Sequence, residues 1–353
     1  MGRPRRSLPS SPVFKNLPLW ANAALFLASA AVVWLAGSRL ARYVDAIADK
    51  TGIGRQFLGI LLLGGVTSLP ELASSATATL TGSPALAVNG VLGSAAVNVL
   101  LLAVADAVFG RNALTSTPGT PQVMLQAVLG IVLLSLVVGA VVAGDVLVLG
   151  IGAFSWAMLA GYVGAVWLLA KAKDLHSWRP ERGGQDEQGP SPDAGSQSTG
   201  RLSAKTAAAG AVILVAGYVL AQSGDAIARQ TGLGQGFFGA VFLGLATSLP
   251  ELSTVIASVR LRRYEMAMAD VFGTNLFNVT IVVLIDALHG GEPVLTEVSR
   301  SAGFGALLAI LLTAIFLVGM IERRDRTVLR MGIDSLLVLG CYLGGVVVLY
   351  LIG

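Results

Sequence analysis

Runs of apolar residues long enough to cross a lipid bilayer recur from near the N-terminus to the last residues of the chain. A helix of about 20 such residues spans a hydrocarbon layer of roughly 30 Å. Polar breaks separate the runs, which cover 17–38, 56–80, 84–109, 121–143, 146–170, 205–223, 235–259, 265–288, 302–321 and 332–352. Because backbone groups at membrane depth need partners within the chain, we expect an all-α integral membrane protein with ten transmembrane helices.

Composition supports a membrane protein and excludes several other classes. Only 12% of the 353 residues are charged, whereas soluble domains carry about 25%. The apolar runs continue to the C-terminus, which excludes a signal peptide on a soluble body. One cysteine, Cys341, and two histidines, His176 and His289, leave no disulfide framework and no Cys- or His-ligated metal site. We therefore expect no cofactor, no nucleic-acid partner and no enzymatic activity, and a monomer that suffices for function.

One long polar stretch, 172–203, divides the chain into two halves. It is rich in Gly, Pro, Ser, Gln and charged residues and almost lacks aliphatic side chains, so it cannot bury enough surface to offset the entropy lost on ordering. We interpret it as a flexible linker between two five-helix halves, 17–171 and 204–353, with an N-terminal tail at 1–16.

The two halves carry the same sequence motif. The stretch DAIADKTGIGRQFLGILLLGGVTSLPEL begins at Asp45, and DAIARQTGLGQGFFGAVFLGLATSLPEL begins 180 residues later at Asp225. An identical T-S-L-P-E-L hexapeptide at matching places indicates internal duplication. The same offset pairs Glu71 with Glu251, Gly93 with Gly273, Ser94 with Thr274, Asn98 with Asn278 and Asp106 with Asp286.

Five helices in each half predict that the halves lie in opposite orientations across the membrane. Such inverted repeats are common in secondary transporters. With the termini outside, the side that holds the linker carries 18 of the 24 Lys and Arg residues, although four of the other six lie in the N-terminal tail. The positive-inside rule then predicts external termini and a cytoplasmic linker in a multi-pass cell-membrane protein.

Two glutamates lie in the middle of apolar runs. A charged side chain at the centre of the bilayer costs at least a few kcal/mol, so it is retained where it faces a cavity, a partner or an ion. A structural ion pair is the alternative, but no Lys or Arg lies in the interior of any run. Glu71 and Glu251 are therefore predicted to bind cations.

Hydroxyl and amide side chains accompany both glutamates at helical spacing. Thr67 and Ser68 precede Glu71 by four and three residues, which places them on one helix face. All these groups offer oxygen, the ligand of hard cations such as Ca²⁺ and Na⁺ rather than zinc or copper. The alternative for any one of them is a hydrogen bond to a neighbouring helix. The predicted metal-binding set is Glu71, Glu251, Thr67, Ser68, Ser94, Asn98, Thr247, Ser248, Thr274 and Asn278, with backbone at Gly64 and Gly244.

The backbone part of this prediction comes from two prolines. Pro70 and Pro250 precede the glutamates, and each should break its helix, because proline lacks an N–H and clashes with the carbonyl four residues earlier. We hypothesise that carbonyls at 64–66 and 244–246 complete the ion shell, as in transporters with broken helices.

The paired T-S-L-P-E-L motifs, each followed by Gly-Ser or Gly-Thr and then Asn98 or Asn278, resemble the α-repeats of the sodium/calcium exchanger family, within the calcium/cation antiporter superfamily. The resemblance covers both repeats and the layout of ten spans in two halves. It implies that the ten side chains of the predicted set line ion sites. It also implies exchange of Na⁺, or H⁺ in relatives, for Ca²⁺ by alternating access, with the first and sixth spans as gating helices.

The chain departs from the family pattern at several positions. The family usually has Asp where Asn278 stands, the order of Asn89 and Gly90 is reversed, and Ala95 occupies the place of Asn275. With only two carboxylates at the cavity, we expect fewer Na⁺ sites than in a three-sodium exchanger, or a proton-coupled cycle, since two charges balance one Ca²⁺, two Na⁺ or two H⁺.

Other functions stay open at this point. A proton-coupled Ca²⁺ antiporter or a Na⁺/H⁺ antiporter would use the same glutamates, and a passive cation channel belongs to another class. Asp106 and Asp286 form a second matched pair, but VADAV and LIDAL lack the glycine-flanked aspartate of intramembrane proteases. We expect these two as carboxylates at helix ends, with a role in an ion vestibule as the alternative.

Overall fold

The computed structural model describes residues 12–51, 65, 67–109, 114–116, 120–171, 198–260, 264–298, 300–322, 327–328 and 331–352. Helices form almost all of this part of the chain. The first half contains α1 (Pro12–Asn16), α2 (Leu19–Thr51), α4 (Leu69–Leu80), α5 (Pro84–Phe109), the short 3-10 helix η1 (Leu114–Ser116), α6 (Pro121–Ala143), strands β1 (Leu147–Val148) and β2 (Ile151–Gly152), and α7 (Ala153–Lys171).

The second half, described from residue 198 onward, has a similar order of elements. It contains α8 (Thr199–Thr231), α9 (Gln235–Phe238), the π-helical segment η3 (Gly239–Leu243), α10 (Gly244–Thr247), α11 (Leu249–Arg260), α12 (Tyr264–His289), α13 (Val294–Glu297), α14 (Arg300–Glu322), strands β3 (Thr327–Val328) and β4 (Met331–Gly332), and α15 (Ile333–Ile352).

Eight helices in the described ranges are long and apolar enough to cross a membrane, and the bent series from α9 to α11 makes a ninth candidate. The expected span at 56–80 lies partly outside the described residues, which include α4 but not 52–64. The prediction of a helical, multi-pass membrane protein is therefore confirmed.

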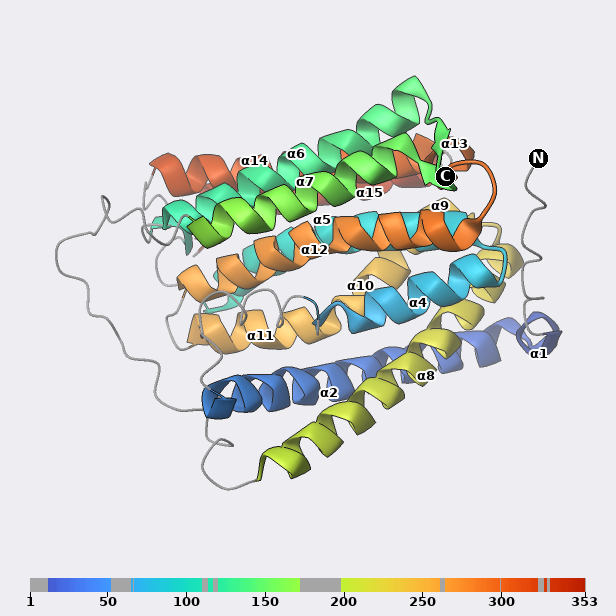
Figure 1. The fold of residues 1–353 in the computed structure, drawn as a ribbon, viewed down its shortest axis with the longest axis horizontal. Coiled ribbons are helices and arrows are strands. Elements are labelled where there is room, and N and C mark those ends of the chain that lie inside the picture. Colours follow the sequence, from blue (N-terminus) through green and yellow to red (C-terminus); the bar gives the residue numbers. More distant parts are fainter. Residues whose placement is uncertain are drawn as a thin grey trace.

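The helices lie in layers around a buried central pair (Figure 1). α5 and α12 are the most enclosed of the long helices. α6, α7, α14 and α15 cover them on one side, whereas α4 and α11 lie on the other side, where α2 and α8 cross over them. α1 and the end of α15 lie at one end of the molecule, and the end of α7 and the start of α8 lie at the opposite end.

The sides of the bundle present large apolar residues to the surroundings. Trp20, Leu27, Val132, Val163 and Leu351 are each more than half exposed. Apolar surface on this scale marks contact with another apolar phase, here lipid. The 33-residue helices α2 and α8 are each about 50 Å long, so they must tilt or project beyond the hydrocarbon layer.

Several boundaries differ from those expected, among them the end of α2, which runs to Thr51 rather than to 38. The run at 146–170 begins with a hairpin in which Leu147 pairs with Gly152, so its helix starts only at Ala153. Its residues are apolar, so the run itself gave no sign of the turn at Leu149 and Gly150, which both have positive φ. In the second half, Ser198 accepts a hydrogen bond from the Arg201 N–H and caps α8. Helix therefore replaces the last residues of the expected linker, 199–203.

Candidate functional site

The helix that carries Glu251 is broken next to that residue. α10 ends at Thr247, Ser248 has φ −81° and ψ 6°, and α11 begins at Leu249 after a bend of 49°. Pro250 supplies no N–H, so the Ala246 carbonyl lacks its usual partner four residues later. The predicted break is confirmed in the second half, and the π-helical segment just before it adds a further irregularity.

The same local geometry precedes Glu71. Ser68 has φ −78° and ψ 5°, against −81° and 6° at Ser248, and α4 begins at the next residue. Each glutamate thus lies in the first turn of a helix, where the helix dipole favours a negative charge. Gly64, a predicted backbone ligand, lies outside the described residues.

Glycines allow the central helix α5 to touch the broken helix. A Cβ on Gly93 would lie 2.0 Å from the carbonyl oxygen of Ala240 in η3, and a Cβ on Gly244 would lie 2.7 Å from the backbone nitrogen of Ser94. No side chain fits at either contact. Backbone therefore packs on backbone, and this brings Ser94 to the break in the opposite half.

Hydrogen bonds join the two repeats across this contact. Ser94 donates to Glu71 Oε1 at 2.7 Å, and its hydroxyl oxygen lies 2.6 Å from that of Ser248. Ser68 donates to Asn278 Oδ1 at 3.0 Å. The structure thus brings side chains from α4, α5, α12 and the α10–α11 break into one cluster.

The threonines before the breaks lie across from the glutamates of the other half. Thr67 lies close to Glu251, and Thr247 lies close to Glu71. Thr247 also donates to the carbonyls of Leu243 and Gly244, at 3.1 and 3.2 Å. The Gly244 carbonyl in addition accepts the Ser248 N–H. Of the predicted carbonyls at 244–246, Ala246 is therefore the better candidate ligand.

The cluster is buried and has an excess of acceptors. All ten predicted side chains are at most 2% exposed. Both carboxylate oxygens of Glu251, Glu71 Oε2, Asn98 Oδ1 and Thr274 Oγ1 have no hydrogen-bond partner among the described residues. Buried polar atoms are normally hydrogen-bonded, because an unsatisfied one costs free energy. Such a set of oxygens needs cations or protons to be stable.

Two residues near the cluster were missed by the sequence prediction. Asn275 accepts from Asn98 at 2.9 Å and donates to the Ala95 carbonyl at 2.9 Å, so it links α5 to α12. Asp270 on α12 is a third carboxylate near Glu251. Matching by repeats could not find either, because Ala95 and Gly90 stand at the corresponding positions of the first half.

The two long outer helices touch the glutamate helices through glycine. A Cβ on Gly37 of α2 would lie 2.5 Å from Pro250 Cγ, and a Cβ on Gly217 of α8 would lie 2.6 Å from Ala73 Cβ. These two glycines are 180 residues apart. Each long helix therefore rests closely on the glutamate helix of the other half, because the glycine itself presents no side chain at the contact.

Asp106 and Asp286 hold the two halves together at helix ends. Asp286 accepts from the N–H groups of Gly152 and Val294, both at 2.7 Å, and from the Ser155 hydroxyl at 2.6 Å. Asp106 accepts from the Leu114 and Gly332 N–H groups at 3.0 and 2.8 Å. The expectation of carboxylates at helix ends is confirmed, and each fixes a hairpin of the other half.

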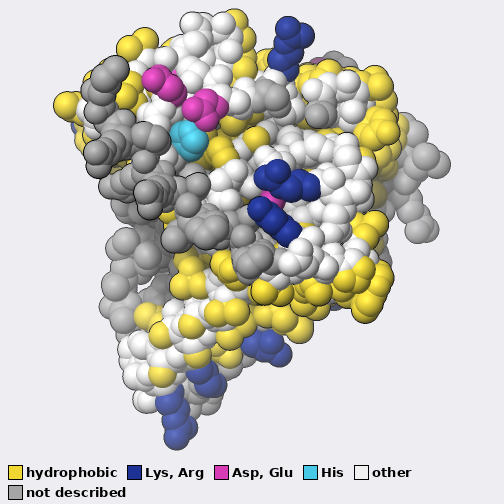
Figure 2. Space-filling model, turned by 90° about the vertical axis from the view of Figure 1, so that its right-hand side faces the viewer, with side chains coloured by type: hydrophobic (Ala, Val, Ile, Leu, Met, Phe, Trp, Pro, Cys, Tyr) yellow, Lys and Arg dark blue, Asp and Glu magenta, His cyan; other side chains and the backbone are white. Residues whose placement is uncertain are grey.

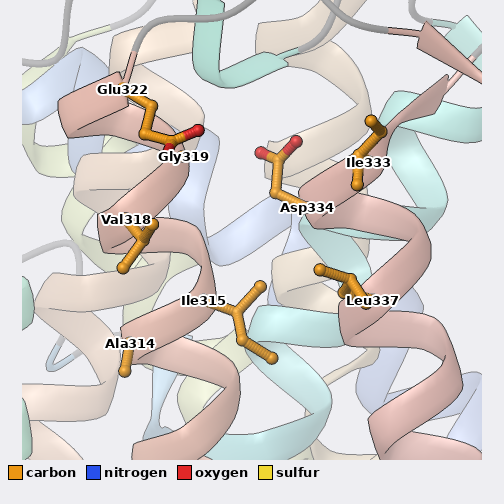
Figure 3. A pocket seen from close by; sticks show the side chains of 8 residues that line it. All are labelled: Ala314, Ile315, Val318, Gly319, Glu322, Ile333, Asp334 and Leu337. Carbon is orange, nitrogen blue, oxygen red and sulfur yellow. The ribbon is translucent and has the colours of Figure 1, made fainter.

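A groove of about 340 Å³ lies apart from this cluster, between α14 and α15 (Figure 3). Glu322 and Asp334 project at one end of it, and Ile315 and Leu337 line the part below. None of the predicted ion ligands borders it. In the part of the chain that the structure covers, no three His, Cys, Asp or Glu side chains gather as a metal site, so any ion shell at the glutamates needs the hydroxyl and amide oxygens.

Comparison with known proteins agrees with this arrangement. A sequence profile described as "Sodium/calcium exchanger protein" matches residues 21–171 and 205–351. The inner membrane protein YrbG of Escherichia coli K12 is 29% identical over 268 residues, which cover 75% of this chain and 79% of that protein.

Two solved structures have the same fold. The crystal structure of the H⁺/Ca²⁺ exchanger CAX superimposes with a TM-score of 0.69 at 14% identity, covering 97% of this chain and 87% of that one. The sodium-calcium exchanger NCX_Mj superimposes with a TM-score of 0.58 at 16% identity, covering 94% and 99%.

Proposed function

Because the chain belongs to the sodium/calcium exchanger protein family, we propose that it is a secondary active antiporter that exchanges Ca²⁺ for Na⁺ or H⁺ by alternating access. One observation carries the proposal: Glu71 and Glu251 are fully buried in one cluster, and three of their four carboxylate oxygens lack partners among the described residues. Their charge and the surrounding oxygens suit a hard cation.

Shared ligands explain why the transport would be an exchange. Ca²⁺ and the counter-ion both need Glu71 and Glu251, so the binding of one kind of ion excludes the other. Two buried carboxylates without a cation are costly. The protein without bound ions would therefore rarely switch the side to which its site is open. Only the ion-bound protein would make this switch, so each transported ion would be exchanged for another.

We further propose ten transmembrane helices in two inverted five-helix repeats. The contacts of Asp106 and Asp286 support this, since their partners Gly332 and Gly152 are also 180 residues apart and belong to hairpins at opposite ends of the molecule (Figure 1). The tenth helix of this proposal is the span expected at 56–80, of which 56–64 and 66 lie outside the described residues.

The proposed orientation places the termini outside and the linker in the cytoplasm of a cell-membrane protein. Among the described residues, Lys15 of α1, Arg229 in the last turn of α8 and Arg300 at the start of α14 belong to the side where α8 terminates, whereas 18 of the 24 Lys and Arg residues of the sequence fall on the side that holds the linker. Seen face on, the end where α8 terminates has apolar side chains along parts of its rim (Figure 2). Positive charge concentrates on the cytoplasmic side of membrane proteins, so this end is assigned to the outside. The chain from Lys171 to Thr199 then lies on the cytoplasmic side.

α2 and α8 are the proposed gating helices. Gly37 and Gly217 present no side chain at these contacts, so the helices can slide along the glutamate helices once the hydrogen bonds of Trp34 and Ser38 to Ser253 break. A slide would open the cluster alternately to each side.

The proposed counter-ion is Na⁺ or H⁺. The fold is shared with an H⁺/Ca²⁺ exchanger and with a sodium-calcium exchanger. Asn278 stands where a third carboxylate is usual in sodium/calcium exchangers, and this favours fewer Na⁺ sites or coupling to protons. A Na⁺/H⁺ antiporter would also use Glu71 and Glu251.

Uptake of radiolabelled Ca²⁺ into proteoliposomes tests the function. We expect uptake when a Na⁺ gradient or a pH gradient is applied, with saturation and Ca²⁺/Ca²⁺ counterflow. Uptake driven by membrane potential alone, without counterflow, would indicate a channel. Na⁺/H⁺ exchange without any Ca²⁺ flux would favour the Na⁺/H⁺ antiporter.

A further inference from the structure

We propose that Asp270 forms an additional cation-binding site on the ion path, between Glu251 and the connection from α11 to α12. The inference rests on the proposed antiport function and deepens it. The site would take the transported hard cation, Ca²⁺, on its way to or from the glutamates.

Asp270 lies on the same face of α12 as two residues of the predicted ion set. Positions 270, 274 and 278 are spaced by four residues, so the side chains of Asp270, Thr274 and Asn278 form one line along the helix. Thr274 and Asn278 are buried in the cluster, at 0% and 1% exposure, whereas Asp270 is only partly buried. The line therefore leads from the cluster toward the start of α12.

One hydroxyl ties Asp270 to the helix of Glu251. Thr254 donates to Asp270 Oδ2 and lies 2.9 Å from the backbone carbonyl oxygen of Glu251. Thr254 is three residues beyond Glu251 on α11, so Asp270 lies about one helical turn, roughly 5 Å, farther along that helix. This places it on the side where α11 leads to α12.

Both carboxylates have oxygens without a partner among the described residues. Asp270 Oδ1 is enclosed and unpaired, and Glu251, at 0% exposure, has both oxygens unpaired. Through Thr254 the two carboxylates lie about one helical turn apart along α11, close enough to repel each other when both are ionised. A cation held between them would relieve this repulsion and supply the missing partner.

The first half lacks this feature. Ser74 matches Thr254 and lies 3.2 Å from the Glu71 carbonyl oxygen, as the repeat predicts. The position that matches Asp270 is Gly90, where a Cβ would already lie 3.0 Å from Leu243. The added negative charge therefore belongs to only one of the two access routes, the cytoplasmic one in the proposed orientation.

The test is Ca²⁺ transport by the Asp270→Asn variant, in proteoliposomes sorted by the orientation of the protein. Asn keeps an oxygen that can accept from Thr254 but removes the charge. We expect the half-saturating Ca²⁺ concentration at the α11–α12 side to rise about tenfold, because local charge concentrates counter-ions. The value at the opposite side should stay unchanged. Glu265→Gln, which neutralises an exposed acid at the start of the same helix, is the matched control and should leave both values unchanged.

Two results would overturn the inference. One is an unchanged half-saturation at the α11–α12 side, and the other is an equal rise at both sides, which would assign Asp270 to positioning Glu251. If Asp270→Asn does not yield folded protein, Asp270→Gly replaces it in the test, because the matching position of the first repeat is Gly90. The half-saturating Ca²⁺ concentrations at the two sides are then compared in the same way. If the wild-type protein shows no Ca²⁺ exchange, the proposed function itself fails. Exchange by the wild type with unaltered variants removes only the inference about Asp270.

Discussion

Replacing Gly93 with alanine tests whether the close backbone contact between α5 and η3 builds the site. The new Cβ would lie 2.0 Å from the Ala240 carbonyl oxygen and 2.4 Å from its Cα, and an ordinary contact begins at 3.4 Å. The two segments would have to separate by about 1.4 Å. Overpacking of a tight core costs about 1–3 kcal/mol. We therefore expect a clear fall in melting temperature.

The same displacement would damage the cluster, because Ser94 is the next residue. Its hydrogen bonds, 2.7 Å to Glu71 and 2.6 Å to Ser248, cannot both survive a shift of this size. A loss of about 1.4 kcal/mol in binding corresponds to a tenfold weaker affinity. We expect Ca²⁺ affinity to fall by at least about that factor.

The assay combines thermal unfolding in detergent with Ca²⁺ uptake per folded molecule. Gly130→Ala on α6 is the control, since its Cβ meets nothing within 4 Å, and it should keep both properties. If Gly93→Ala kept the melting temperature and the uptake of the wild type, the argument that backbone contact positions the site would be wrong.

Two further substitutions separate structural roles from transport. Asp286→Asn should lower the melting temperature but keep transport per folded molecule. Hydrogen bonds to a charged group contribute about 1.5–3 kcal/mol each, and the NH₂ group of Asn would face hydrogen-bond donors. Unaltered stability with lost transport would instead favour a role of Asp286 in an ion vestibule. Gly217→Ala should slow exchange, since a Cβ would lie 2.6 Å from Ala73 Cβ between α8 and α4. Gly210→Ala on the same helix has open space and should exchange at the wild-type rate; equal rates in both variants would argue against sliding at this contact.

Much of the architecture could be predicted because apolar runs and internal repeats are both visible in sequence. The helix break near Pro250 also follows from local chemistry, since proline removes a backbone donor. The hairpin at Leu147–Gly152 could not be found this way. Its residues are as apolar as the helix that follows, and its turn depends on positive φ at Leu149 and Gly150 rather than on a polar break.

Residues of the candidate site were predictable where both repeats carry them. Glu71 and Glu251 were found from a charge in an apolar run, and their neighbours from spacing along one helix. Asp270 and Asn275 escaped because the first half has Gly90 and Ala95 instead. A functional residue can occur in only one of the two repeats. Matching positions between the repeats therefore finds the residues that both halves share and misses those that only one half has.

Contacts between the halves are harder to predict than the residues that make them. Asp106 and Asp286 were correctly expected at helix ends, but each also has a partner in the other half that lies more than a hundred residues away, Gly332 and Gly152 respectively. Spacing along a helix gives no information on which residues of the other half will lie next to it. The pairing of Ser94 with Ser248 likewise depends on which glycines let the backbones meet.

The most direct test of the account is Ca²⁺ exchange by Glu71→Gln and Glu251→Gln, each reconstituted at the same density as the wild type. Gln keeps the size of the side chain and removes the charge that binds the cation. We predict that each variant stays folded by size-exclusion chromatography and loses gradient-driven Ca²⁺ exchange. Exchange at the wild-type rate in both variants would contradict the assignment of the two glutamates as the ion-binding site.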